Sequence, residues 1–400
     1  MYYTIILIMS YFILPNILNI LTVQDINIIN TQESESVDDH TIVISKSLAE
    51  YLNVMKCQID NYNDEWDIYK KYTNTYEYIH TIIPQYKYPV CKLKPLSRSY
   101  YKLIEIMNTL AITFPNEPIK SFHLAEGPGG FIEALIYYRK NNLNNENDIY
   151  TGITLIDDKN ENIPGWKKSR DFLDNNTNVN IIKGADNTGD ILNINNFWYC
   201  YTNYKNSMDF ITADGGFDYS NNFNKQETVS INLILAQVIY AIGLQKPGGT
   251  FILKIFDIFT QVTIDILYML SSLYEKCYII KPNTSRNANS EKYIVCKVFK
   301  YINTDILISK LVINFGNTKT ILRVLNIKIP YLYINKLEDI NAILGQQQLE
   351  NILYTLHLLD NNKSDKLEVI KKNNIQKCIQ WCIKNSLPYY KNINQSNVFT

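Results

Sequence analysis

The sequence predicts an α/β fold, in which a mainly parallel sheet with an antiparallel final strand is followed by a mainly helical C-terminal region. Three observations support this fold class. Short apolar runs typical of buried strands alternate with longer helical stretches between residues 119 and 274. A glycine-rich turn follows the first of these runs. The last two apolar runs lie too close together for a crossover helix between them.

The composition is that of a folded chain without an excess of either charge. The 400 residues are 46% hydrophobic, which suffices for a sizeable core and suggests two or three structural units. Lysine plus arginine and aspartate plus glutamate both number 39, so the formal net charge is zero. Any contact with nucleic acid is therefore expected to be local. The seven cysteines include no CxxC pair, so reduced, buried thiols are expected.

Residues 1–24 form an apolar segment without a charged side chain. The segment is long enough to span a bilayer, but it lacks a basic start and a clear cleavage site, and Pro15, Asn16 and Asn19 interrupt it. A buried or partner-facing segment is therefore favoured, and contact with a membrane stays open as the alternative. Residues 25–94 are expected to be an N-terminal extension, whose polar, acidic part at 25–45 is typical of a linker.

The elements of the sheet follow in order along the chain. A helix is expected over 97–112, before the first strand. The apolar runs predict strands over 119–125, 149–155, 178–183, 208–213 and 248–256. Helices are expected between and after these strands, over 130–140, 226–245 and 258–274.

The last two strands, 276–281 and 291–299, are expected to pair antiparallel, because a parallel connection needs a dozen residues or more. The polar loop between them contains SRNANSE, residues 285–291. After about residue 302 the pattern becomes mostly helical. We therefore expect one α/β domain over 95–302 and a helical C-terminal domain over 303–400.

The first strand ends in AEGPGGFIEAL, a glycine-rich turn that opens a helix. Glycines let the backbone approach a nucleotide-like ligand, which would lie beyond the carboxyl ends of the strands. The turn is neither GxGxxG nor GxxxxGK[ST], which disfavours a nicotinamide cofactor and excludes a P-loop. A purely structural turn is the alternative. The candidate ligand-binding residues are Glu126, Gly127, Pro128, Gly129, Gly130 and Phe131.

Three aspartates follow later strands at the same expected edge of the sheet. Asp186 and Asp190 come after the third strand, and Asp214 ends the fourth. Carboxylates in these places suit a cationic ligand with ribose hydroxyls and an adenine amine, features that S-adenosylmethionine combines. The alternative is that Asp186 and Asp190 only close turns.

Lys254 lies inside the apolar run FILKIF, which is typical of a central strand. Lysines are rarely buried without a partner, and near the strand's carboxyl end Lys254 would face the same cleft as Asp214. Burial lowers the pKa of a lysine and a neighbouring carboxylate raises it, so such a lysine can serve as a general base. The alternative is a lysine that reaches water from the strand end.

Residues 86–102, before the first strand, combine five basic residues with four tyrosines and no acid. Basic side chains bind phosphates and tyrosine rings stack on bases, so this pattern indicates an RNA surface. A solvated helix face would explain the charges alone. The basic residues are Lys87, Lys92, Lys94, Arg98 and Lys102.

The chain resembles the FtsJ-like RNA 2′-O-methyltransferases over about residues 95–300. The order and spacing of seven segments carry the resemblance: SRSYYKLIEI, AEGPGGF, GITL, GADNTGDI, TADGGFDYS, GGTFILKIFD and KPNTSRNANSEKYIVCK. The chain is most similar to the Adrift-type branch, which includes eukaryotic cap 2′-O-methyltransferases and relatives from large DNA viruses. The resemblance implies a Rossmann-like S-adenosylmethionine-dependent methyltransferase sheet, S-adenosylmethionine as methyl donor, and a large-DNA-virus source.

The Lys-Asp-Lys-Glu catalytic tetrad of the family falls on Lys102, Asp214, Lys254 and Glu291. The resemblance implies that Lys254 removes the proton of a ribose 2′-hydroxyl or stabilises the developing alkoxide. Asp214 would orient Lys254 and lie near the sulfonium, and Lys102 and Glu291 would hold the ribose and fix the lysine charges. No metal is required for this chemistry.

One departure from the family concerns the second strand, where many methyltransferases place an acid that holds the ribose of the donor. GITL offers Thr154 here, with Asp157 further on and Glu126 as a possible substitute. The expected RNA contacts are Lys94, Arg98, Ser285, Arg286 and Asn289.

The favoured substrate is the cap-adjacent nucleotide of mRNA. Two alternatives stay open: an internal ribose of ribosomal or transfer RNA, and a non-catalytic RNA-binding or virion protein that keeps only the fold. A protein partner is expected, if at all, through the C-terminal helical region. The activity is expected in the host cytoplasm, in a viral factory or virion, or in the nucleus as the alternative.

Overall fold

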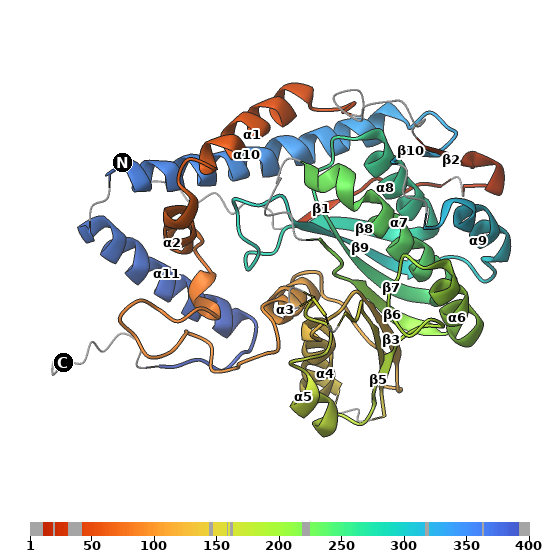
Figure 1. Cartoon of the computed structure of the whole chain (residues 1–400), viewed down its shortest axis with the longest axis horizontal. Coiled ribbons are helices and arrows are strands. Elements are labelled where there is room, and N and C mark those ends of the chain that lie inside the picture. The colour runs from red at the N-terminus through yellow and green to blue at the C-terminus, as the bar shows by residue number, and fades with distance from the viewer. Residues whose placement is uncertain are drawn as a thin grey trace.

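The computed structural model describes residues 11–18, 21–30, 42–143, 147–157, 159–160, 163–217, 225–316, 320–361 and 364–391. Its centre is an eight-stranded sheet with the order β1-β8-β9-β7-β6-β3-β4-β5 (Figure 1). The strands are β1 (Tyr11–Ile13), β3 (Lys120–Leu124), β4 (Ile149–Ile153), β5 (Val179–Ile182), β6 (Met208–Ala213), β7 (Gln245–Ile255), β8 (Tyr274–Ile280) and β9 (Lys292–Phe299).

Five neighbouring strands, β5, β4, β3, β6 and β7, run parallel, and β9 lies antiparallel between β7 and β8. The predicted strands and the predicted antiparallel pair are thus confirmed, although β7 begins three residues before its predicted start at residue 248. Because β3 has β4 on one side and β6 on the other, the strand order reverses there. In open α/β sheets the ligand crevice lies outside the carboxyl ends of the strands at such a reversal.

Helices cover both faces of the sheet, because successive residues of its buried strands point to opposite sides. Ile211 and Phe251 belong to the hydrophobic cluster that contains helices α7 and α8, whereas Phe210 and Ile252 belong to the cluster with α3 and α4. The helices on the sheet are α3 (Ser99–Thr109), α4 (Gly130–Leu143), α5 (Arg170–Asn175), α6 (Ile194–Tyr204), α7 (Gln226–Leu244) and α8 (Gln261–Leu273). The sequence predicts all of them except α5 and α6.

Part of the N-terminal apolar segment contributes to the core. Strand β1 pairs antiparallel with β8 at the edge of the sheet, and Phe12, Leu14 and Ile17 are buried. The favoured burial is therefore confirmed for these three residues, whereas Ile13 and Leu18 are exposed and residues 1–10 and 19–20 lie outside the described residues. Within the described part of the chain, α7 is long and apolar enough to cross a membrane, and 83% of its apolar window is buried in the protein.

The predicted linker at 25–45 is wrong for part of its length. Strand β2 (Ile26–Asn30) pairs antiparallel with β10 (Ile321–Leu325), because Ile26 and Ile321 pack into the same core. Residues 31–41 lie outside the described residues.

The regions before and after the sheet pack on each other as well as on the sheet. Helices α1 (Lys46–Ile59) and α2 (Asn63–Thr73), for which the sequence shows no clear signal, contact the long α10 (Tyr331–Asn361) (Figure 1). Helix α11 (Ser364–Lys384) contacts the short turn η2 (Glu77–Ile79). A short helix, α9 (Asp305–Leu311), and the turns η1 (Val23–Asp25) and η4 (Val312–Asn314) complete the described elements.

The helical C-terminal region shares its apolar residues with the sheet. Tyr333, Leu337, Ile340 and Leu344 of α10 recur at helical spacing and belong to the hydrophobic cluster of β6, β7 and α8. The helices predicted for this region are present, and the domain boundary near residue 302 stays a prediction.

Candidate active site

The four residues of the predicted tetrad meet at the carboxyl end of the sheet. Lys102 extends from α3, Asp214 follows β6, Lys254 lies on β7 and Glu291 directly precedes β9. The Lys102 Nζ atom lies 2.5 Å from Glu291 Oε1. The Lys254 Nζ atom lies 3.3 Å from Asp214 Oδ1 and donates a hydrogen bond of 2.7 Å to the Asp214 carbonyl oxygen. Four side chains from distant parts of the sequence thus form two ion pairs.

Tyr293 connects the two ion pairs and is absent from the sequence prediction. Its hydroxyl lies 2.9 Å from Asp214 Oδ1 and 3.2 Å from Glu291 Oε1. A phenol has one proton, so it donates to one carboxylate at a time. The signal that could have found it is strand alternation, since Glu291 and Tyr293 are two residues apart at the start of β9 and share a face.

The charges in this group compensate one another. Burial alone would raise the pKa of Glu291, but the positive charges of Lys102, Lys254 and Arg98 outweigh it and hold that pKa well below its usual range. Burial lowers the pKa of Lys102, although Glu291 and Asp214 oppose that effect. Burial and the two carboxylates raise the pKa of Tyr293 far above its ordinary value, so its hydroxyl stays protonated.

The alternative from the sequence, in which Lys254 reaches water from the strand end, is not what the structure shows. The Lys254 side chain is largely buried and its ammonium turns toward Asp214. Gly216 packs closely against it, because a Cβ atom at that position would lie 3.0 Å from Lys254 Nζ. The exposed Gly216 therefore lies against the amine, where a larger residue would crowd Lys254.

The glycine-rich turn lies at the end of β3, and the protein's own packing requires its glycines. Gly129 has φ +110°, a conformation that favours glycine. A Cβ atom at Gly127 would lie 2.4 Å from the Gly165 carbonyl oxygen, and one at Gly130 would lie 2.1 Å from Ser97 Oγ. Pro128 accepts a hydrogen bond from the Ser169 hydroxyl, and Phe131 is fully buried. The structural role of this turn is thus plain, and its ligand-binding role stays a prediction.

Glu126 has a structural task that the sequence did not predict. Its Oε1 atom accepts hydrogen bonds from the backbone N–H groups of Phe131 (2.6 Å) and Ile132 (3.2 Å), which are unpaired donors at the start of α4. Burial, followed by the charge of Asp214, raises the pKa of Glu126 well above its ordinary value. A ribose contact by Glu126 or by the buried Thr154 stays a prediction.

Asp186 and Asp190 close turns after β5, which is the alternative weighed from the sequence. Asp186 accepts hydrogen bonds from Thr188 and Asn196, and Asp190 Oδ1 accepts one from the Leu192 backbone. These bonds, led by the one from the Thr188 backbone, lower the pKa of Asp186 to about 2. Both carboxylates nevertheless lie at the same edge of the sheet as Asp214.

The donor set at this edge fits S-adenosylmethionine. The carboxylates that follow β5 and β6 can accept hydrogen bonds from ribose hydroxyls and an amine and can attract a cationic sulfur. Gly216, two residues after Asp214, lies against the Lys254 amine. Among the described residues, no group of three or more His, Cys, Asp or Glu side chains is placed to hold a metal ion.

The loop between β8 and β9 carries three of the predicted RNA contacts. The Ser285 hydroxyl donates to Glu291 Oε1 over 3.2 Å, and Lys281 donates to the carbonyl oxygens of Asn289 (2.6 Å) and Glu291 (2.9 Å). Arg286 makes a two-pronged ion pair with Glu77. The structure thus brings Ser285 to the tetrad and engages Asn289 and Arg286 with other parts of the protein.

The two remaining predicted RNA contacts, Lys94 and Arg98, lie just before α3, and Arg98 is its N-cap residue. Arg98 lies close enough to the site for its positive charge to lower the pKa of Glu291. Lys94 is exposed. Roles of these residues in RNA binding stay predictions.

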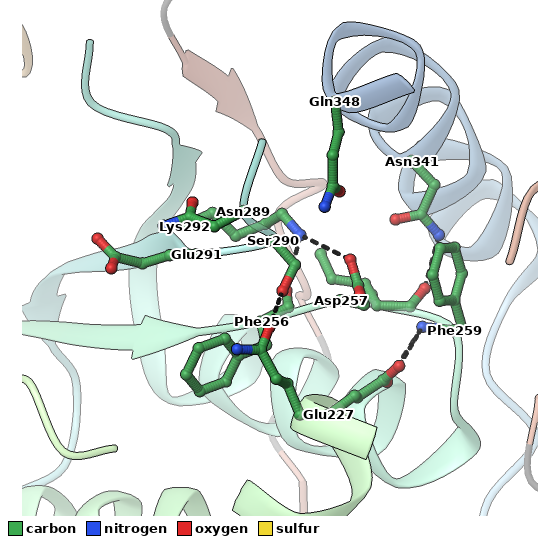
Figure 2. Close-up of polar contacts among 12 residues, drawn as sticks. Glu227, Phe256, Asp257, Phe259, Asn289, Ser290, Glu291, Lys292, Asn341 and Gln348 are labelled. Carbon is green, nitrogen blue, oxygen red and sulfur yellow. Dashed lines mark hydrogen bonds and ion pairs between the residues drawn. The ribbon is translucent and has the colours of Figure 1, made fainter. Parts of the chain in front are cut away.

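A second buried group of charges lies behind Glu291. Asp257 pairs with Lys56 of α1 (3.1 Å) and faces Lys292 (3.7 Å), whose ammonium donates to the Phe256 carbonyl oxygen. Figure 2 shows Glu291 pointing away from Asp257 while its neighbour Lys292 approaches it. Consecutive residues at the start of β9 therefore serve opposite sides, with Glu291 in the candidate site and Lys292 in a structural cluster.

The sequence of this chain is similar to those of known methyltransferases. Residues 95–299 match the family model described as FtsJ-like methyltransferase. The chain is 29% identical over 367 residues to "Cap-specific mRNA (nucleoside-2′-O-)-methyltransferase 2" of Pongo abelii, covering 85% of this chain and 45% of that protein. The protein of the same name from Danio rerio is 32% identical over 244 residues, covering 55% of this chain and 31% of that protein.

"Cap-specific mRNA (nucleoside-2′-O-)-methyltransferase 1" of Bos taurus is 42% identical over 123 residues, covering 29% of this chain and 15% of that protein. The chain therefore spans less than half the length of these curated relatives.

Proposed function

Because this chain belongs to the FtsJ-like methyltransferase family, we propose that it transfers a methyl group from S-adenosylmethionine to a ribose 2′-hydroxyl of RNA, at a nucleotide next to the 5′ cap of mRNA. The observation that carries the proposal is the convergence of Lys102, Asp214, Lys254 and Glu291 into two ion pairs at the carboxyl end of the sheet. The cap as target is supported by the names of the relatives, which are cap-specific mRNA methyltransferases.

S-adenosylmethionine supplies, when bound, a methyl group on a positively charged sulfur. The residues proposed to hold it are the glycine turn, Thr154 and the carboxylates that follow β5 and β6. Asp214 is central to this set, because it lies at the reversal of strand order and also touches Lys254.

Lys254 is the residue proposed to act on the 2′-hydroxyl. Its amine lies beside the exposed Gly216 and is fixed by two contacts with Asp214. From this position it removes the hydroxyl proton or stabilises the oxygen as negative charge develops on it. Neighbouring ionisable groups titrate together, so the apparent pKa values of such a reaction belong to the group as a whole.

Lys102 and Glu291 are proposed to hold the ribose and to set the charge around Lys254. Their 2.5 Å ion pair is buried, and Glu291 also accepts from Ser285 and lies within hydrogen-bond distance of Tyr293. Holding the acceptor hydroxyl within reach of the donor converts the transfer into an effectively unimolecular step. Positioning is therefore the main contribution expected from this pair.

The test compares capped and uncapped RNA of identical sequence, with radiolabelled donor and mapping of the modified nucleotide. The proposal predicts label at a cap-adjacent ribose and little on uncapped RNA. Equal labelling of both RNAs at an internal ribose would overturn the cap assignment. Failure of the purified protein to bind S-adenosylmethionine by calorimetry would favour a non-catalytic protein that keeps only the fold.

The variant Lys254→Ala tests the assigned role of the amine. We expect S-adenosylmethionine binding to persist and transfer to capped RNA to fall by about two to four orders of magnitude, as for loss of a general base. Lys297→Ala is the matched control, since Lys297 lies on the neighbouring strand and donates to the Leu110 carbonyl oxygen. Turnover of Lys254→Ala at the wild-type rate would contradict the mechanism.

A further inference from the structure

Three consecutive residues of the loop before Glu291 are held by side chains from outside the matched region 95–299. Arg286 donates from Nε (3.1 Å) and Nη2 (2.8 Å) to the two carboxylate oxygens of Glu77. The Asn287 backbone N–H donates to the Asn74 side chain (3.3 Å), and the Gln348 side chain donates to the Ala288 carbonyl oxygen (3.0 Å). Figure 2 shows Gln348 extending from α10 toward this loop.

The held residues lie beside the proposed catalytic carboxylate. Ser285, next to Arg286 in the chain, donates to Glu291 Oε1, the atom that also pairs with Lys102. A shift of the loop at Arg286 would therefore move a hydrogen-bond partner of Glu291 and, through it, the Lys102 ammonium. Displacements of about 1 Å at a reacting centre can lower a rate by about a hundredfold.

Glu77 is built as an anchor. Its side chain is 3% exposed and lies in the buried turn η2, which α11 covers. Burial would raise its pKa, but the hydrogen bonds and charge of Arg286 outweigh that effect and lower it to about 2, so the carboxylate is ionised at neutral pH. A buried carboxylate with a two-pronged arginine fixes both distance and orientation.

We infer that Glu77 is a positioning residue, which acts through Arg286 to hold the loop that places Glu291 in the site. The inference rests on the proposed function and assigns to the N-terminal extension a part in turnover. It also changes the expected role of Arg286, from an RNA contact to the link between Glu77 and the loop.

The pair Arg323–Asp265 provides a matched control. It too is an arginine–carboxylate pair between a flanking region and the α/β domain, with Arg323 Nε 2.8 Å from Asp265 Oδ2. Its side chains are 32% and 0% exposed, against 28% and 3% for Arg286 and Glu77. It joins β10 to α8 and has no contact with the loop before Glu291 among the described residues.

The experiment measures kcat and KM for capped RNA, S-adenosylmethionine affinity, and hydrogen exchange of the loop amides in Glu77→Gln, Arg286→Gln, the double variant and Arg323→Gln. We expect Glu77→Gln and Arg286→Gln each to lower kcat about ten- to a hundredfold, with KM and donor affinity near wild type. The double variant should be no worse than either single variant, because both break one link. Loop exchange should quicken in these variants and remain slow in Arg323→Gln, whose kcat should be unchanged.

Three results would overturn the inference. An RNA-contact role for Arg286 would raise KM in Arg286→Gln and leave Glu77→Gln unaffected. A purely stabilising role would give Arg323→Gln the same kinetic loss as Glu77→Gln. Unchanged loop exchange in Glu77→Gln would show that the pair does not hold the loop, and this readout stands even if the wild-type protein does not methylate capped RNA, a result that would refute the proposed function separately.

Discussion

At the scale of single residues, the site depends on how two lysines and two carboxylates share a partly buried space. Lys102 and Glu291 form the more buried pair, and Lys254 with Asp214 form the pair beside Gly216. An unpaired charge in this environment would be costly, so each group needs its partner. The neutral Tyr293 hydroxyl lies within hydrogen-bond distance of both carboxylates, so it links the two pairs without adding a charge.

The variant Tyr293→Phe tests that connection. It removes the hydroxyl and keeps the buried ring, so we expect the protein to fold and the rate of transfer in single-turnover kinetics to fall about ten- to a hundredfold. Tyr240→Phe is the control, because the Tyr240 hydroxyl is buried and has no hydrogen-bond partner among the described residues. A wild-type rate in Tyr293→Phe would show that the ion pairs are positioned without the phenol.

The Glu77 carboxylate predicts a pH dependence of stability. Arg286 lowers its pKa in the folded protein from 4.5 to about 2. A lowered pKa stabilises the fold above about pH 4.5, and that contribution, about 3 kcal/mol, is lost as the pH falls toward 2. The unfolding free energies of wild type and Glu77→Gln, measured by denaturant titration, should therefore differ at pH 6 and converge toward pH 2. A constant difference across this range would contradict the assigned ion pair.

The resemblance to the FtsJ-like family predicted the tetrad but not the residues that support it. Lys254 was conspicuous because a charge inside FILKIF requires a partner. Glu77 was not, because its partner Arg286 lies 209 residues away and nothing in a polar stretch marks one glutamate as buried. Pairings of this range depend on tertiary contacts that local patterns do not contain.

At the scale of elements, the turns after the parallel strands support one another. Gly189, in the turn after β5, packs so tightly on the residue after β4 that a Cβ atom would lie 1.9 Å from the Thr154 carbonyl oxygen. This contact ties Thr154 to the turn that carries Asp186 and Asp190. Two parts of the proposed donor site thus share one rigid connection.

The variant Gly189→Ala should disturb both turns at once. We expect weaker S-adenosylmethionine binding by calorimetry and a loss of stability of about 1–3 kcal/mol. Gly248→Ala is the control, because Gly248 also has positive φ (+82°, against +67° for Gly189), but in the described part of the chain no atom lies within 4 Å of the added Cβ. It should lose about 1 kcal/mol of stability and keep donor affinity. Equal donor affinity in the two variants would show that the turns are independent.

Strands β3 to β9 and helices α3, α4, α7 and α8 were predictable because apolar runs and helical spacing alternate through this part of the chain, whereas the edge strand β1 and helices α5 and α6 were not. The antiparallel β8–β9 pair followed from the short loop alone. Strand β2 was not predictable, because INIIN is short and borders an acidic stretch, and it becomes a strand by pairing with β10 almost 300 residues later. Long-range pairing overrides the local signal in such cases.

At the scale of the whole molecule, the flanking regions complete the α/β domain. Strand β1 extends the sheet beyond β8, and the β2–β10 pair packs on α8 (Figure 1). Asn74 and Glu77, which follow α2, and Gln348 of α10 hold the loop before Glu291. Residues from both flanks therefore stabilise the same core that carries the candidate site.

The variant Phe12→Ala tests whether the N-terminal segment is part of this core. Phe12 is 6% exposed, so its truncation should lower the unfolding free energy by about 3–5 kcal/mol. Ile13→Ala, at a side chain that is 56% exposed, should change it by less than about 0.5 kcal/mol. Thermal and denaturant unfolding measure both, and an equal effect of the two substitutions would contradict the place of β1 at the sheet edge.

The tetrad is proposed to direct methylation of a ribose 2′-oxygen beside an mRNA cap. The most direct measurement uses capped RNA in which the first nucleotides carry either ribose or 2′-deoxyribose, with radiolabelled S-adenosylmethionine as donor. We expect label on the ribose substrate and none when the target nucleotide lacks its 2′-hydroxyl. Label that persists when both cap-adjacent nucleotides are 2′-deoxy would contradict it.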